Sequence, residues 1–170
     1  MRVLQVNKLY EPWVGGVEHH VRDLTNGLKS SIEVKVLTCQ PKGKGIEEKI
    51  DGVEVTRVGS IGLYSGMPIA PLFPLVLRRK ARGADILHFH SPFPLGEASP
   101  LLSGVKNKRI IVTYHSDIVR QKIAFALYKP LFRRFLDRAD KIIVTSPNLL
   151  EASQILQRYQ DKCKIIPLGI

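Results

Sequence analysis

Histidines that follow short apolar runs are the residues best suited to chemistry in this chain. His88 and His90 stand two apart at the end of one run, residues 86–89, and His115 follows another, residues 110–114. If both runs are parallel strands of one sheet, the histidines lie at its carboxyl edge and can share one crevice. We expect a polar contact to a ligand from His115, because imidazole both donates and accepts hydrogen bonds near neutral pH. His88 is interpreted as a packed, hydrogen-bonded core residue.

A metal site is the alternative interpretation of these histidines. No cysteine and no recognisable set of further ligands accompanies them, so we expect neither a metal nor another cofactor. His19 and His20 fall in an expected helix and are interpreted as surface or helix-packing residues. The polar residues that we expect to line the crevice follow the two runs directly: His90, Ser91, Ser116 and Asp117.

A glycine pair follows the first expected strand. The segment 7–18 leads from that strand through a loop to Gly15 and Gly16, which open an amphipathic stretch. Free amides at a helix N-terminus favour an anion, and glycine lets a phosphate approach the backbone closely. A simple turn is the alternative. The pattern is neither G-x-G-x-x-G nor a P-loop, which argues against a hydride-transfer enzyme and an NTPase.

Short apolar runs alternate with helical patterns along the chain. Strands are expected at residues 3–6, 34–37, 53–58, 86–89, 110–114, 142–145 and 165–166. Helices are expected from Gly15–Gly16 to Leu28, over 72–82, over 118–139 with a kink or break at Pro130, and over 147–159 with Ser146 as cap. The order predicts one α/β domain over residues 1–170, a doubly wound, mainly parallel sheet of about seven strands.

Two segments match neither pattern. Residues 41–51 are interpreted as a mobile surface turn, because Lys and Gly alternate at its start. Residues 60–74 form a longer loop rich in Pro and Gly, and we expect a functional role for a loop of this length.

The 170 residues carry 26 Lys and Arg against 15 Asp and Glu, a formal charge of +11. This charge favours an anionic partner such as nucleic acid, a phospholipid surface or a phosphorylated small molecule. No nucleic-acid-binding signature is present, so nucleic acid is not expected. With only Cys39 and Cys163 and no long apolar segment, we expect a cytoplasmic protein with peripheral contact to the membrane.

Five segments in order and spacing resemble the N-terminal domain of family 4 glycosyltransferases of the GT-B fold, such as phosphatidylinositol and lipopolysaccharide mannosyltransferases. The segments are Gly15-Gly16-Val17-Glu18, the stretches 84–90, 112–115 and 139–146, and Ile165-Ile166-Pro167-Leu168-Gly169. The resemblance implies a retaining, metal-independent enzyme in which this domain holds the acceptor and a second domain holds the nucleotide sugar. This chain is then expected to be half of the enzyme, with little or no transfer by itself.

The resemblance also assigns residues. Gly15 and Gly16 match the loop that approaches the donor diphosphate and the acceptor, and Tyr10 and Glu11 fall in the matching acceptor loop. His115 matches the histidine near the transferred sugar, where a hydrogen bond from its ring or backbone would steady charge in the transition state. The donor is expected to be a GDP- or UDP-sugar and the acceptor lipid-linked or phosphorylated.

Basic residues cluster after an apolar segment in the second expected helix: Arg78, Arg79, Lys80 and Arg82. Basic groups beside exposed apolar side chains suit an anionic bilayer, and membrane-associated members of this family dock through a similar helix. A solvated face that only maintains solubility is the alternative. For the whole chain, the alternative to a transferase is a non-catalytic Rossmann-like module that binds an anionic lipid or phosphorylated ligand.

Overall fold

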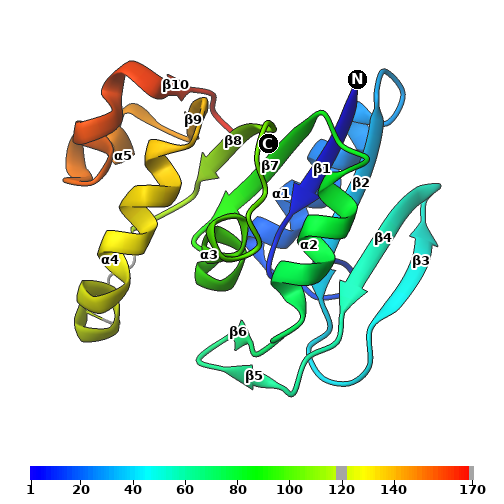
Figure 1. Cartoon of the computed structure of the whole chain (residues 1–170). Coiled ribbons are helices and arrows are strands. Elements are labelled where there is room, and N and C mark those ends of the chain that lie inside the picture. The colour runs from blue at the N-terminus through cyan, green and yellow to red at the C-terminus, as the bar shows by residue number, and fades with distance from the viewer. Residues whose placement is uncertain (118–121, 169–170) are drawn as a thin grey trace.

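In the computed structural model, an eight-stranded sheet crosses the whole molecule (Figure 1). The structure describes residues 1–117 and 122–168, and for residues 122–126 it describes the backbone alone. The strand order is β10-β9-β8-β7-β1-β2-β4-β3, and every neighbouring pair is parallel except β4 and β3. The strands are β1 (Arg2–Val6), β2 (Glu33–Cys39), β3 (Ile46–Ile50), β4 (Val53–Val58), β7 (Ile86–Ser91), β8 (Arg109–Tyr114), β9 (Lys141–Val144) and β10 (Cys163–Ile165).

Helices cover both faces of this sheet. Helix α1 (Gly16–Leu28) lies behind the sheet in Figure 1, and the others lie on the opposite side or beside its far edge. The others are α2 (Phe73–Ala81), α3 (Pro94–Leu102), α4 (Lys122–Asp137), α5 (Pro147–Ala152) and the 3-10 helix η1 (Leu156–Lys162). The predicted doubly wound, mainly parallel α/β fold is confirmed. Six predicted strands are present near their expected positions, and the seventh, expected at 165–166, lies earlier as β10.

Alternation along the strands divides the core in two. On β1, Leu4 and Val6 join the large cluster under α2, α3 and α4, which includes Phe73 and Phe135. The smaller cluster under α1 joins Tyr10 and Val21 to valines of β2 and β4. Because strand side chains alternate between faces, Gln5 points to the α1 side. The central strands are therefore apolar on one face and carry polar groups at the carboxyl end of the other.

The interpretation of residues 41–51 as a mobile turn is wrong. Residues 46–50 form β3, which pairs antiparallel with β4 along the sheet edge. Asp51 and Gly52 join the two strands with φ of 49° and 83°, as expected for a two-residue hairpin turn. The charged sequence of β3 conceals the strand because its apolar residues do not alternate, and such charge is typical of an edge strand.

Helix α3 was not predicted. Two prolines and a glycine interrupt its sequence, yet Pro94 occupies the first turn, where no amide donor is needed. A Cβ at Gly96 would lie 2.3 Å from the Phe93 ring, so this glycine lets the ring pack against the helix. The apolar side of α3 then joins the large core.

Segment 60–74 contains a small hairpin of β5 (Leu63–Tyr64) and β6 (Met67–Pro68), separate from the main sheet. Ser65 and Gly66 form its turn with φ of 49° and 75°. Its predicted functional role stays a prediction.

The two C-terminal helices differ from expectation. The sequence predicts a kink or a break at Pro130, but helix α4 continues through this residue as one element, so the break is wrong and the kink stays a prediction. The predicted helix start at Ile118 and the motif residue Gly169 lie outside the described residues. Ser146 caps α5 as predicted, accepting the Leu149 amide at 3.2 Å, but the expected helix ends early because Ser153 is extended. Among the described residues, no helix is long and apolar enough to cross a bilayer.

Candidate functional site

The sheet reverses its strand order between β1 and β7. The chain runs from β1 to β2 and β4 on one side, then returns to place β7 and β8 on the other side of β1. Ligands of open α/β sheets bind in the crevice at such a reversal, beyond the carboxyl ends of the strands. Such a crevice is expected here beyond the carboxyl ends of β1 and β7.

Four polar side chains occupy the α1 face of the sheet at the reversal. Gln5 pairs in register with His88, and His90 pairs with Thr113 on the next strand. All four side chains are buried. Residues two apart on a strand point to the same face, so the His-x-His pattern places His88 and His90 on one face of β7, and the parallel register brings Gln5 and Thr113 beside them.

A chain of hydrogen bonds links these groups. His90 Nε2 donates to Gln5 Oε1 at 2.8 Å, which leaves Nδ1 of a neutral His90 without a proton. That Nδ1 lies 3.2 Å from His115 Nε2, and His88 Nε2 lies 2.7 Å from Thr113 Oγ1. The His115 backbone amide donates to the Ser91 carbonyl at 3.0 Å, so it is the ring that remains available to a ligand.

His20 completes the cluster from helix α1. Its ring centroid lies 5.3 Å from that of His115 and 5.8 Å from that of His90, both at steep interplanar angles. The interpretation of His20 as a surface or packing residue missed this contact. His20 lies one turn after Gly16, on the side of α1 that faces the sheet edge, whereas its neighbour His19 is exposed. A helical-face analysis of the glycine motif would have separated the two histidines.

Burial keeps these histidines uncharged. It lowers the pKa of His88 to about 3 and that of His115 to about 4. Burial likewise lowers the pKa of His20, and the pKa of His90 lies well below its usual value for the same reason. At neutral pH the cluster therefore offers neutral rings that can accept as well as donate hydrogen bonds.

The two glycines at the start of α1 have different surroundings. A Cβ at Gly15 would lie 2.2 Å from Glu18 Oε2, because the buried Glu18 side chain folds back over this residue. A Cβ at Gly16 would meet nothing within 4 Å. Gly15 thus accommodates Glu18, whereas Gly16 leaves an open approach to the helix N-terminus, where backbone amides favour an anion.

Tyr10 and Glu11 are held by the fold. The Tyr10 ring is buried in the core under α1, and burial raises its pKa. Buried Arg57 of β4 donates to both backbone carbonyls, to that of Tyr10 at 3.2 Å, and it also pairs with Glu48 of β3. The Tyr10 side chain therefore anchors the loop and is not free to contact an acceptor, whereas Glu11 has a buried Oε2 without a partner among the described residues.

Two of the other crevice candidates have structural partners. Ser91 donates to the buried carboxylate of Glu97 on α3, which also accepts from Tyr128. Asp117 accepts from Tyr114 and, at 2.8 Å, from Ser153. Ser116 is exposed. Of the four predicted crevice residues, His90 alone belongs to the histidine cluster.

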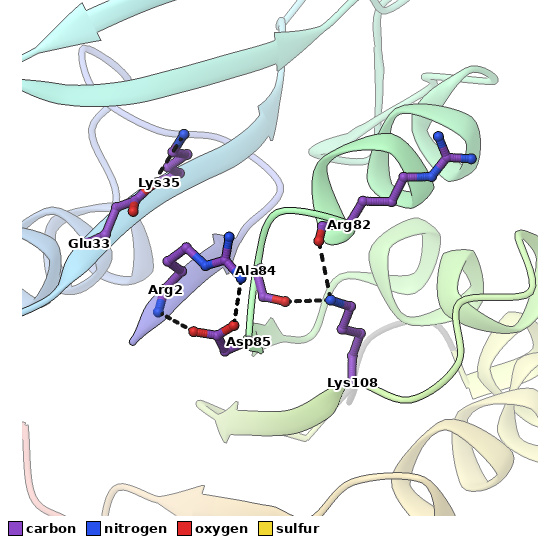
Figure 2. Close-up of polar contacts among 7 residues, drawn as sticks. All are labelled: Arg2, Glu33, Lys35, Arg82, Ala84, Asp85 and Lys108. Carbon is purple, nitrogen blue, oxygen red and sulfur yellow. Dashed lines mark hydrogen bonds and ion pairs between the residues drawn. The ribbon is translucent and has the colours of Figure 1, made fainter.

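The predicted basic residues lie on α2 and directly after it, on the opposite face of the sheet from α1 (Figure 1), and they are partly neutralised. Glu47 Oε1 of β3 accepts from Arg79 at 2.8 Å and from Lys80 at 2.9 Å. Within the described part of the chain, Arg78 and Arg82 have no acidic partner, and Figure 2 shows the Arg82 guanidinium pointing away from the contacts around it. The expected four-residue patch is therefore reduced to two unpaired charges.

An open groove lies between α2 and the edge of the sheet. Its volume is about 670 Å³, and Lys44, Glu47, Arg57, Ile61 and Leu72 are among the residues that line it. The histidine cluster does not contribute to this groove. The groove is thus a second surface, separate from the reversal point.

Comparison with known proteins decides the family. The family model for Glycosyltransferase Family 4 matches residues 14–170. The chain belongs to glycosyltransferase family 4. The predicted resemblance is thereby confirmed, and with it the assignment to a family of transferases.

Two curated relatives align along the full chain. The chain is 41% identical over 173 residues to D-rhamnosyltransferase WbpZ of Pseudomonas aeruginosa and 35% identical over 172 residues to O-antigen chain mannosyltransferase C of Escherichia coli. It covers 45% and 46% of these proteins, respectively. The chain therefore spans about half the length of the curated relatives it matches.

Solved structures share the fold of this family 4 domain. The structure aligns over 99% of its length with 48% of sucrose-phosphate synthase from Thermosynechococcus elongatus, at a TM-score of 0.72 and 20% identity. It aligns over its full length with 44% of Anabaena HepE in complex with UDP-glucose, at a TM-score of 0.66 and 12% identity. These similarities confirm the GT-B half-domain architecture.

Proposed function

We propose that this chain is the acceptor-side domain of a retaining glycosyltransferase. The full-length enzyme would move a hexose from a nucleotide-sugar donor to a lipid-linked or phosphorylated acceptor in glycan synthesis. The observation that carries the proposal is the open face of Gly16 at the N-terminus of α1, one turn before His20, whose ring centroid lies 5.3 Å from that of the neutral His115. Together they offer an anion site and a polar contact at one sheet edge.

The donor assignment has support from relatives. The curated relatives are named as a mannosyltransferase and a D-rhamnosyltransferase, and HepE is described with UDP-glucose. We assign a GDP- or UDP-sugar to this protein, with its diphosphate directed at Gly16. A second domain in the full-length protein would hold most of the nucleotide.

His115 is the residue that we assign to the reacting sugar. Its backbone amide is used by Ser91, so its ring would hydrogen-bond the sugar and steady charge as the glycosidic bond breaks. A leaving phosphate oxygen can take the acceptor proton, so the domain needs no dedicated base. The transfer itself is proposed to need no metal ion.

Steady-state kinetics of the full-length protein test this role. His115→Ala is expected to lower kcat/KM by roughly 10²-fold, because one polar contact to the transition state is lost. The exposed His19→Ala is the matched control and is expected to retain the wild-type value. Equal kcat/KM for His115→Ala and wild type would remove the proposed role.

Membrane contact is proposed for the surface around α2. Leu72 and Leu75 are each 62% exposed, and Tyr64 of the β5–β6 hairpin is 74% exposed. Arg78 and Arg82 add unpaired positive charge beside them, a combination that suits an anionic bilayer. The protein would then act peripherally at the cytoplasmic face on a membrane-borne acceptor.

Co-sedimentation with anionic vesicles tests this contact. Replacing Arg78 and Arg82 with Ser is expected to weaken salt-sensitive binding more than replacing Arg79 and Lys80, which already pair with Glu47. Unchanged binding in the Arg78/Arg82 variant would contradict the membrane proposal. The non-catalytic alternative would be supported if the full-length protein bound vesicles or phosphorylated ligands but transferred no sugar.

A further inference from the structure

We propose that His20, His90 and His115 form a binding site for a zinc ion. One ring nitrogen of each histidine can be chosen so that the three atoms all lie within 4.8 Å of one another. The three residues come from different elements: helix α1, strand β7 and the segment after β8. Three neutral imidazoles with an open fourth position are a common protein environment for Zn²⁺.

One pair of ring nitrogens is already spaced to share a metal ion. Zinc binds imidazole nitrogen at about 2.0–2.1 Å. His90 Nδ1 and His115 Nε2 lie 3.2 Å apart. Two ligands at this separation subtend an angle of roughly 100° at zinc, close to the tetrahedral angle. His20 approaches from α1 with its ring steeply inclined to the other two. One of its ring nitrogens lies within 4.8 Å of the other two ligand atoms, so a small movement of this partly exposed ring brings it within reach of the ion.

The surroundings of His90 resemble the outer shell of a metal site. Zinc-bound histidines ordinarily donate their other ring N–H to a carbonyl or carboxylate oxygen, which fixes the ring and its tautomer. Here Gln5 Oε1 accepts the His90 Nε2 proton at 2.8 Å, and Nδ1 faces the other two histidines without a proton. Gln5 thus holds the His90 ring in the tautomer whose Nδ1 can bind a metal ion. Hydrogen bonding of His88 to Thr113 leaves that ring outside the set.

An ion can reach the site from solvent. His90 is buried, but His20 and His115 are each partly exposed. To bind zinc, His115 carries its proton on Nδ1, so that Nε2 offers a lone pair where it otherwise donates to His90. The remaining coordination position would be taken by water.

Zinc binding has a consequence for transfer that rests on the proposed function. A bound ion engages the His115 ring that we assign to the reacting sugar and fixes its proton on Nδ1. Zinc would therefore inhibit transfer by competing for this residue, as a ligand of the site and not as a cofactor. The metal site itself stands on the histidine geometry alone.

Titration of the purified protein with ZnCl₂, followed by calorimetry and by the visible absorption of bound Co²⁺, tests the site. All variants would carry Cys163→Ser, because Cys163 is the partly exposed thiol. The neighbouring histidines of α1 offer a matched pair, since His20 belongs to the cluster and His19 is exposed. Circular dichroism without metal would confirm that each variant retains the fold.

We expect one zinc ion per chain in the parent and in His19→Gln, with tetrahedral Co²⁺ absorption. His20→Gln is expected to weaken zinc binding by roughly 10²-fold. His115→Gln serves as a second ligand variant with the same expectation. The absence of saturable binding by the parent would overturn the proposal, as would equal affinities of His19→Gln and both ligand variants.

A rate measurement separates this inference from the proposed function. In the full-length enzyme, zinc is expected to lower the transfer rate of the parent, and EDTA is expected to restore it. Each variant would be compared with itself with and without zinc, and His20→Gln should be less sensitive than His19→Gln. Zinc that binds stoichiometrically without changing the parent's rate would contradict the assigned role of His115 and leave the metal site standing.

Discussion

Polar groups are arranged differently at the two ends of the parallel strands, which we call the amino edge and the carboxyl edge of the sheet. At the amino edge, Asp85 accepts both the backbone amide and the guanidinium of Arg2, at 2.8 and 2.9 Å. Lys108 Nζ donates to the Ala84 carbonyl at 2.7 Å (Figure 2), and Lys35 pairs with Glu33 and Glu54. At the carboxyl edge, neutral histidines at the ends of β7 and β8 form the polar cluster. Buried polar atoms there lack partners among the described residues, including Gln5 Nε2 and Glu18 Oε1.

This difference distinguishes an edge that maintains the fold from one that is prepared for a ligand. Exposed ion pairs contribute little to stability, so the amino edge tolerates change. An unpaired buried polar group costs about 1–3 kcal/mol, and a fold retains such groups where they serve another role. The contrast predicts that changes at the carboxyl edge affect pH dependence and activity, whereas changes at the amino edge affect neither strongly.

The largest expected effect is the loss of stability in mild acid. The folded-state pKa values of His88 and His115 lie far below the usual 6.5, so the unfolded chain binds more protons between pH 6.5 and 5. Stability is therefore complete above about pH 6.5 and falls as pH decreases toward the folded pKa values. Each such histidine contributes about 2 kcal/mol of loss by pH 5. Urea unfolding of wild type and His115→Gln at pH 7.5 and 5 measures the loss in the free energy of unfolding. An equal loss in the two proteins would contradict the low folded-state pKa of His115.

Gln5→Leu is the next largest test. The variant leaves the buried His90 Nε2–H without its acceptor, which is expected to lower the free energy of unfolding by about 1–3 kcal/mol. Chemical denaturation at pH 7.5 measures the change. A variant as stable as wild type would show that Gln5 does not restrain His90.

The two glycines at the start of α1 separate a structural role from a ligand-binding role at the carboxyl edge. Gly16→Ala meets no atom and is expected to preserve or slightly raise stability, by about 0.5 kcal/mol, while kcat/KM of the full-length enzyme falls about 10-fold or more. Gly15→Ala displaces the Glu18 carboxylate and is expected to lower stability itself. Thermal unfolding measures the stability of both variants, and steady-state kinetics of the full-length enzyme measure their kcat/KM. Full activity of Gly16→Ala would argue against ligand approach at this residue.

The smallest effect is expected at the amino edge. Asp85→Asn weakens the pairing with Arg2, which holds the pKa of Asp85 below its usual value. Since both side chains are exposed, Tm and kcat/KM are expected to stay close to wild type. A large loss of activity in this variant would break the distinction between the two edges.

The sequence predicted the elements whose apolar residues carry a clear period. Strands such as residues 53–58 and helix α1 followed from that period, and so did the placement of His90 and His115 at one edge. Strand β3 and helix α3 were missed because charge and proline obscure their patterns. The same omission explains the error on the basic patch: Glu47, which pairs with both Arg79 and Lys80 and offsets one of their two charges, lies on the missed strand.

The side-chain environment of the site was harder to predict. Tyr10 stands next to the glycine loop in sequence, but its ring turns into the core, and Arg57 holds the backbone that follows it through the carbonyls of Tyr10 and Glu11. His20 joins the cluster only through the packing of α1 against the sheet edge. Such contacts depend on long-range packing, which local residue patterns do not encode.

The most direct test of the ligand-binding edge is NMR of the full-length protein during titration with its nucleotide-sugar donor. The histidine ring resonances of His115 and His20 would report on the carboxyl edge, and the backbone amide of Asp85 would report on the amino edge. We expect saturable shifts of the two histidine rings while the Asp85 amide stays unchanged. Donor binding that leaves both histidine rings unshifted would contradict this expectation.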